Sequence, residues 1–178
     1  MAQPIEVREG YHIEHTNRES ASAKATKAVV VLLLLVSTGL MVIIAVGGWS
    51  KMAGAQPILI GYILLYLLMA YYVLRWNRGV LTMCAALAMI LGIFAAIAGP
   101  EWFSRDKPGF TSPALDESVL GLLTLLLVPV QILQIAFSMR GFQQAWNVEV
   151  EVRDGEHYRP GEFHGDDDGP AHREPAPA

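Results

Sequence analysis

The chain has 178 residues, of which 53% are hydrophobic and 17% charged, and its formal net charge is -4. Lysines and arginines are scattered and outnumbered by carboxylates, so we expect no nucleic-acid partner. A single cysteine, Cys84, excludes an intrachain disulfide and any Cys-x-x-Cys redox pair.

Four apolar stretches without a charged side chain dominate the sequence. Each is about 18 to 20 residues long, close to the roughly 20 residues that an α-helix needs to cross a bilayer. The runs do not alternate as barrel strands do. We therefore predict an all-α fold, a polytopic membrane protein with four transmembrane helices between residues 28 and 138. The predicted helices are 28–46, 57–74, 80–99 and 119–138.

Basic residues predict the orientation. They gather in the tail 1–27, in the link after the second stretch and after the fourth, whereas only Lys51, Arg105 and Lys107 fall on the other side. By the positive-inside rule, both termini should lie in the cytoplasm and the protein in the inner membrane. The first stretch lacks a small-residue cleavage site, so we expect it to be retained.

The two tails contain similar segments. Residues 5–12 read IEVREGYH and residues 150–157 read VEVRDGEH. Each alternates with period two and then has an acidic residue followed by glycine, a pattern typical of a hairpin turn with positive φ. Pairing of two short hairpins into one sheet is one interpretation, addition of the hairpins to the sheet of a partner is a second, and a chance similarity is the third. His12, His15, His157 and His164 would gather if the hairpins pair, but their spacing matches no metal signature, and we expect no metal site.

The second helix ends in residues suited to the headgroup region, where amphipathic rings and snorkelling cations are favoured. The link 75–79 is so short that this helix and the next must form an antiparallel hairpin. Tyr62 and Tyr66 lie one turn apart, and we interpret them as packing residues, with a quinone or lipid groove as the alternative. The residues expected at the lipid interface are Arg75, Trp76, Arg78, Trp102, Arg140 and Trp146.

The third helix has Ala88, Gly92 and Ala96 at four-residue spacing. Small residues in this pattern allow another helix to approach closely in lipid. The spacing does not say whether the partner belongs to the same chain. Cys84 in this helix is expected to act as a small hydrophobic residue.

The loop 100–118 is a candidate extracytoplasmic docking surface. Ser112 followed by Pro113 predicts a helix N-cap and first residue, with Asp116 and Glu117 near the positive end of the helix dipole. A membrane enzyme would have to use the carboxylates of this loop, which are Glu101, Asp106, Asp116 and Glu117.

The fourth helix is the most polar, and Pro129 should kink it. Its polar residues recur at helical spacing, which predicts one face turned away from lipid. We interpret that face as interhelical hydrogen bonding, with a hydrated seam or small-ligand site as the alternative. The helix-packing and polar-face residues are thus Ala88, Gly92, Ala96, Thr124, Gln131, Gln134 and Ser138, with Gly121 on the same face.

After the fourth helix, residues 139–160 should form a cytoplasmic interfacial segment with the β-hairpin, and residues 161–178 a disordered acidic tail. No phosphate loop, dinucleotide fingerprint, nucleophile elbow or zinc helix occurs. We expect no enzyme, no catalytic residues and no cofactor.

These features predict a non-catalytic accessory or assembly subunit of a larger membrane complex, with membrane lipid and other integral membrane proteins as partners. The architecture is similar in shape to small accessory subunits of respiratory complexes, although no motif supports that likeness. The alternative function is a small transporter or pore for a neutral solute, formed by a homo-oligomer and lined by Thr124, Gln131, Gln134 and Ser138.

Overall fold

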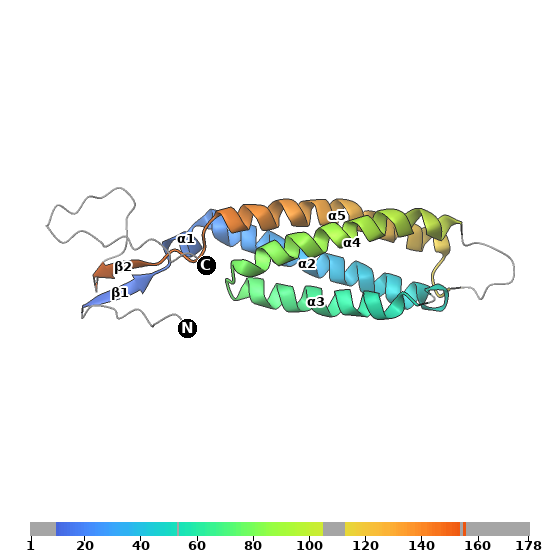
Figure 1. The fold of residues 1–178 in the computed structure, drawn as a ribbon, viewed down its shortest axis with the longest axis horizontal. Helices are drawn as coiled ribbons and strands as arrows, with labels where there is room; N and C mark the ends of the chain where they lie inside the picture. Colours follow the sequence, from blue (N-terminus) through green and yellow to red (C-terminus); the bar gives the residue numbers. More distant parts are fainter. Residues whose placement is uncertain (1–9, 53, 105–112, 154, 156–178) are drawn as a thin grey trace.

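The computed structural model describes residues 10–52, 54–104, 113–153 and 155. Four long helices lie side by side in an elongated bundle (Figure 1). They are α2 (Ala21–Gly48), α3 (Gln56–Leu74), α4 (Gly79–Phe103) and α5 (Glu117–Gln143). All four are long and apolar enough to cross a membrane, so the expected four-helix fold of a multi-pass membrane protein is confirmed at that level.

Each long helix except α3 extends beyond the apolar run that predicted it. The helix α2 begins at Ala21, where Ser20 accepts a hydrogen bond from the Ala23 amide at 3.1 Å. The helix α5 begins at Glu117, because the Asp116 carboxylate accepts a hydrogen bond from the Ser118 amide and caps the first turn. The predicted cap at Ser112 is therefore wrong, and Ser112 itself lies outside the described residues.

Helices α3 and α4 are joined by a tight turn but pack mainly on other helices. The α4–α5 interface is the most extensive in the bundle, followed by α2–α5 and α2–α3, whereas α3 and α4 share few contacts. Figure 1 shows these two diverging from their turn. The expected hairpin thus exists as a chain connection rather than as a packed pair. At the turn, Trp76 adopts a φ of 61°, which is unusual for a residue other than glycine.

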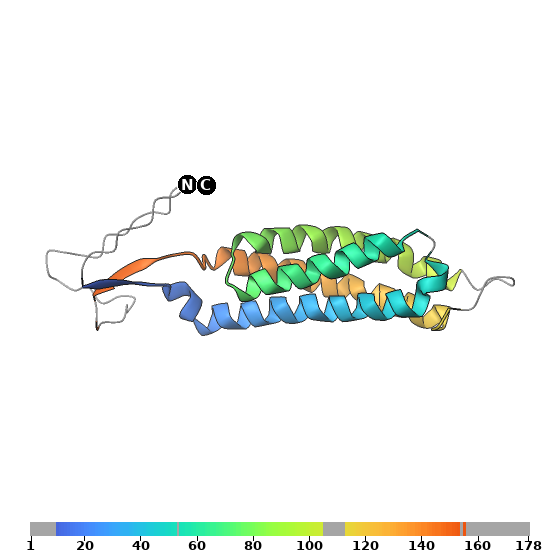
Figure 2. The same cartoon turned by 90° about the horizontal axis from the view of Figure 1, so that it is seen from below.

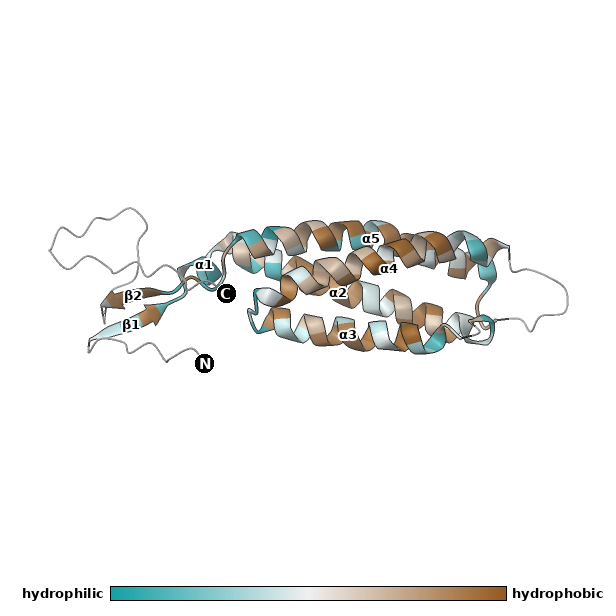
Figure 3. Cartoon of the chain, viewed as in Figure 1, coloured by the Kyte–Doolittle hydropathy of each residue, from teal (hydrophilic) through white to brown (hydrophobic). Residues whose placement is uncertain are grey.

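The bundle is apolar inside and outside (Figure 3). Its core is a continuous seam of buried side chains contributed by all four long helices. Large apolar side chains also cover the outside, among them Val46, Leu64, Ile97 and Leu122, each more than 60% exposed. Such a surface is unfavourable in water but is matched by lipid.

The chain segments flanking the bundle meet in a two-stranded antiparallel sheet beyond one end of it (Figures 1 and 2). Strand β1 (Tyr11–Glu14) pairs with β2 (Val150–Arg153), so that Tyr11 faces Arg153 and Glu14 faces Val150. The short helix α1 (Thr16–Glu19) connects β1 to α2. We call this end of the bundle the tail end, and the opposite end, which carries the 3-10 helix η1 (Trp49–Lys51), the loop end.

The sheet corrects the interpretation of the two tail segments. Gly10 and Gly155 do have positive φ, 84° and 94°, as the predicted turns require. In the first tail the described strand follows Gly10, and this strand, β1, pairs directly with β2. Residues 5–9 and 156–157, which would complete the two hairpins, lie outside the described residues, as does the tail 161–178.

Candidate functional site

The polar residues predicted for the fourth helix all face the interior of the bundle. Thr124, Gln131, Gln134 and Ser138 are each at most 5% exposed. Gln131 lies at the centre of the network: its amide nitrogen donates to Ser37 Oγ in α2 at 2.9 Å, and its amide oxygen accepts from the Tyr66 hydroxyl in α3 at 2.7 Å. One side chain of α5 thereby links two further helices.

The rest of this polar face makes local hydrogen bonds. The Thr124 hydroxyl donates to the Leu120 carbonyl at 2.7 Å, and Gln134 Nε2 donates to Ser138 Oγ at 3.0 Å. Gln134 Oε1 is buried without a hydrogen-bond partner. A buried amide oxygen in this state carries a desolvation cost that no contact offsets.

The small-residue face of α4 packs against α5 of the same chain. Ala88 is fully buried, and a Cβ on Gly92 would lie 3.4 Å from the Gln131 Cβ. Ala96, in contrast, is exposed, and the buried stripe continues through Ala95 and Gly99. A strict four-residue spacing drifts off a face that turns every 3.6 residues, which explains the difference. At Gly99 an added Cβ would lie 2.5 Å from a Leu125 methyl group.

Two tryptophans expected at the lipid interface are instead buried. Trp146 has no exposed surface, and Trp102 is 3% exposed and packs against Gly48. Trp146 packs on Trp76 in an edge-to-face geometry with the ring centroids 5.2 Å apart. The Lys27 ammonium lies 3.8 Å from the Trp76 ring centroid. The three side chains join α2, the α3–α4 turn and the segment after α5.

The two arginines of the α3–α4 link behave differently. Arg78 donates through Nε to the Phe142 carbonyl at 2.8 Å and through a terminal guanidinium nitrogen to Asn147 at 3.1 Å, so it caps the end of α5. Arg75 is exposed beside the Tyr71 ring, and Arg140 is exposed on α5, so the placement of both suits the interface.

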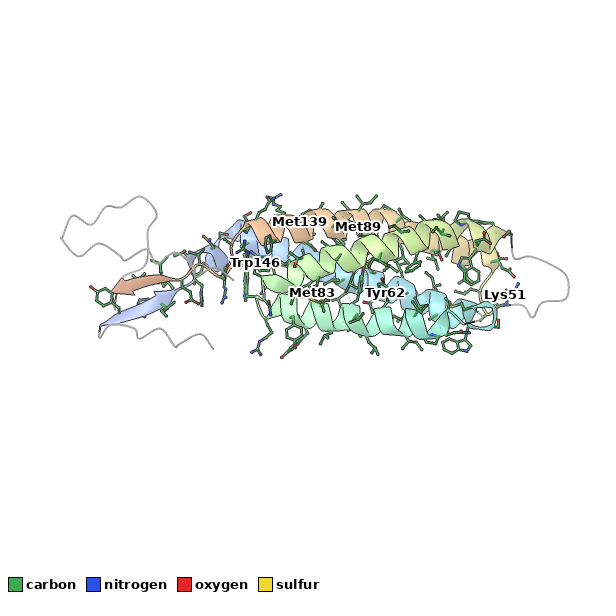
Figure 4. All side chains as sticks on the ribbon, viewed as in Figure 1. Lys51, Tyr62, Met83, Met89, Met139 and Trp146 are labelled. Atoms are coloured by element: carbon green, nitrogen blue, oxygen red, sulfur yellow. The ribbon has the colours of Figure 1, made fainter. Side chains whose placement is uncertain are left out.

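The segment after α5 is held by backbone acceptors. Arg18 Nε donates to the Trp146 carbonyl at 2.7 Å, and Asn17 donates to the Ala145 carbonyl at 3.1 Å. Ala145 has a φ of 48°, a left-handed conformation that these contacts surround. We refer to Arg18, Lys27, Trp76, Arg78 and Trp146 as the tail-end clasp. Figure 4 labels Trp146 at this position.

At the loop end a groove of about 490 Å³ lies between the four long helices. Its walls are mostly apolar and include Ile58 and Leu59 of α3 and Phe94 and Ala98 of α4. Tyr62, which the sequence assigned to packing, also lines this loop-end groove. Figure 4 labels Tyr62 on α3.

An ion pair lies beside the loop-end groove. The Lys51 ammonium donates to the Glu117 carboxylate, and their side chains are 7% and 16% exposed. Glu117 also lies in the first turn of α5, where the helix dipole favours a negative charge. Asp116 performs the capping: hydrogen bonds from the Ser118 hydroxyl and amide hold the pKa of its carboxyl below the usual range. The Glu117 carboxylate thus takes part in an ion pair, and the Asp116 carboxylate in a helix cap.

Two of the four tail histidines, His12 and His15, belong to the described part of the chain. His12 Nε2 lies 3.3 Å from the Glu14 carboxylate, and His157 and His164 lie outside the described residues. Among the residues that the structure describes, no three His, Cys, Asp or Glu side chains are grouped to hold a metal ion. Cys84 is a buried free cysteine in α4.

Sequence reasoning missed Ser37 and Lys51 as partners. Ser37 is the single hydroxyl of α2 that meets Gln131, but it sits beside Thr38, whose hydroxyl bonds its own helix at the Leu34 carbonyl, 2.8 Å away. Lys51 is 66 residues from Glu117 in the chain, and no local pattern links the two.

No family model, no curated protein and no solved structure matches this chain.

Proposed function

We propose that the protein is a non-catalytic accessory or assembly subunit of a larger membrane complex, with both tails on the cytoplasmic side of the inner membrane. One observation carries this proposal: the two tails pair as β1 and β2, and the tail-end clasp fastens them to the bundle. A four-helix membrane domain with an attached extramembrane element suits a protein that holds partners in place.

The sheet offers a means of binding such a partner. Two strands of four residues each are marginal on their own in water. Addition of a strand from another protein would extend the hydrogen-bonded ladder, a recurrent mode of protein recognition. The clasp favours this by holding the strands in a fixed place, which lowers the entropy lost on binding.

The outer helix faces offer a second contact region within the membrane. Helix α3 is the least buried of the four, with only four buried residues, Tyr66, Met69, Ala70 and Val73. In lipid, helices associate through close packing rather than through a hydrophobic driving force. An exposed α3 can therefore contact either membrane lipid or a helix of a partner.

The alternative, a pore formed by a homo-oligomer, has less support from the geometry. Its proposed lining residues face the interior of one chain, and both polar groups of the Gln131 amide are engaged there. A path between copies would require α5 to turn its polar face outward and give up these contacts.

Native mass spectrometry of protein extracted from its own membrane in mild detergent tests the accessory role. We expect larger subunits in fixed stoichiometry with the wild type and with Val150→Thr, which keeps a β-branched residue in β2. Val150→Pro should release these subunits because proline disrupts the ladder. Homo-oligomers alone, together with solute flux in vesicles that Gln131→Leu abolishes, would favour the pore instead.

A further inference from the structure

The loop-end groove has the length of one bilayer leaflet. Along α4 its wall runs from Trp102, in the last turn of the helix, to Leu91. The rise from Leu91 to Trp102 corresponds to about 16 Å along the axis at about 1.5 Å per residue. The hydrocarbon core of a bilayer is about 30 Å thick, so the groove reaches from one surface to about the midplane.

The deep part of the groove is suited to hydrocarbon. The buried side chains of Leu91 and Ala95 in α4 and of Leu127 in α5 line it. The Thr124 hydroxyl, which also lines it, already donates to the Leu120 carbonyl and presents little unmet polarity. A hydrocarbon chain in the groove would make van der Waals contacts with apolar side chains on both sides. These contacts would replace the space between the diverging helices α3 and α4.

The rim of the groove faces outward, where lipid would surround the bundle. Ile58 on one side is 60% exposed, and Phe94 and Ile97 on the other are 53% and 64% exposed. A hydrocarbon chain can therefore enter sideways from the membrane. Because α3 and α4 pack little against each other, the bundle has room between these two helices.

The mouth of the groove is where charge appears. Lys51 lines it at the end of η1, and Glu117 is bonded to the same ammonium. A lysine at the end of a membrane helix is suited to contact a lipid phosphate. The adjacent Glu117 carboxylate can accept a hydrogen bond from an amine of the lipid headgroup. The pairing of a cation with an anion at the mouth complements a headgroup that itself carries both charges.

We propose that the loop-end groove binds a bilayer phospholipid, with one acyl chain between α3 and α4 and the phosphate beside Lys51. Four properties of the groove favour a phospholipid: its length, its apolar walls, its lateral opening and the charges at its mouth. The bound lipid fills the space that α3 and α4 leave between them and acts as part of the bundle. This proposal is independent of the accessory role.

Native mass spectrometry of the full chain released from nanodiscs of phosphatidylethanolamine and phosphatidylglycerol tests the acyl-chain site. Wild type should retain one phospholipid. Ala98→Phe fills the groove and should lose that lipid, whereas Ala96→Phe is the matched control because Ala96 is exposed at nearly the same depth and does not line the groove. Equal lipid retention by the two variants would overturn the proposal, as would retention of an isoprenoid quinone or detergent in place of phospholipid.

Competition between phospholipid and diacylglycerol with identical acyl chains tests the headgroup contact. A charge-assisted hydrogen bond to Lys51 predicts a preference of about tenfold for phospholipid. Lys51→Arg should keep the preference, and Lys51→Gln should remove it while the acyl chain still binds. Helix content by circular dichroism confirms that each variant is folded. A preference that is unchanged in Lys51→Gln would show that the phosphate does not lie at Lys51.

Discussion

At the scale of single residues, Gln131 and Gln134 show how two identical side chains on one helix differ in their surroundings. Gln131 forms hydrogen bonds with Ser37 and Tyr66 on two other helices. Gln134 donates a hydrogen bond to Ser138 only, and its amide oxygen has no hydrogen-bond partner. Both side chains are buried. Their contributions to stability should therefore have different signs or sizes.

Gln131→Met should destabilise the bundle, because it removes two interhelical hydrogen bonds and leaves the Tyr66 hydroxyl and Ser37 buried without that partner. We expect a loss of about 1 to 2 kcal/mol. Reversible unfolding in detergent micelles measures it. Ile132→Met is the control, since Ile132 is 62% exposed on the outer face.

The double variant Gln134→Met with Ser138→Ala should be as stable as wild type or more stable. It removes a local hydrogen bond together with the unpaired oxygen, and replacement of both partners by apolar groups can be neutral or favourable. The same unfolding measurement applies. A loss as large as that of Gln131→Met would mean that Gln134 has an essential partner in the membrane.

Asp116 gives a pH dependence at the start of α5. Its pKa is lowered by the hydrogen bonds from Ser118, so the capping stabilisation is present above the ordinary aspartate pKa and is lost as pH falls through the lowered value. The protection factors of the first-turn amides of α5, in which exchange is corrected for the intrinsic effect of pH on its rate, should fall on acidification. In Asp116→Asn, which still caps but does not titrate, this fall in protection should disappear; if it persists, another group is responsible.

At the scale of helices, the close approach of α4 to α5 depends on glycine. Gly99→Ala should destabilise the protein, because the new Cβ would lie 2.5 Å from a Leu125 methyl and 2.6 Å from its Cγ, so the Leu125 side chain must leave its packed position. Gly61→Ala in α3 meets nothing within 4 Å and should be stabilising by up to about 1 kcal/mol through helix propensity. Opposite shifts of the melting temperature are expected, and a shift of equal sign would contradict this packing.

The divergence of α3 from α4 also belongs to this scale. The short turn 75–78 brings the two helices together in sequence, yet α4 gains its largest interface with α5. Small residues on α4 match the polar and small face of α5, whereas α3 presents bulky tyrosines and leucines. Helix packing in lipid follows surface shape more closely than chain connection.

At the scale of the whole molecule, the tail-end clasp joins the membrane bundle to the sheet. Trp146 is fully buried against Trp76, and its carbonyl accepts from Arg18. Trp146→Ala should create a cavity and free the chain between α5 and β2, with a loss of about 3 to 5 kcal/mol. Limited proteolysis should then cut this segment faster. Trp49→Ala is the control because Trp49 is 51% exposed at the other end, and equal cleavage of both variants would contradict the clasp.

Some of these features follow from the sequence alone because they are set by local composition. Runs of about 20 apolar residues determine four helices, since backbone groups in lipid must be satisfied within the helix. Helical periodicity placed the polar side chains of α5 on one face, and the two glycines in the tails marked positions of positive φ.

Tertiary structure decided what those faces meet. Whether Trp146 lies in lipid or under Trp76, whether Gln131 lines a path or bonds Ser37, and whether α3 packs on α4 all depend on residues far apart in the chain. Such pairings are chosen by shape, burial and charge in three dimensions, which the spacing of residues along one helix does not contain. The ion pair between Lys51 and Glu117 and the groove beside it are of this kind.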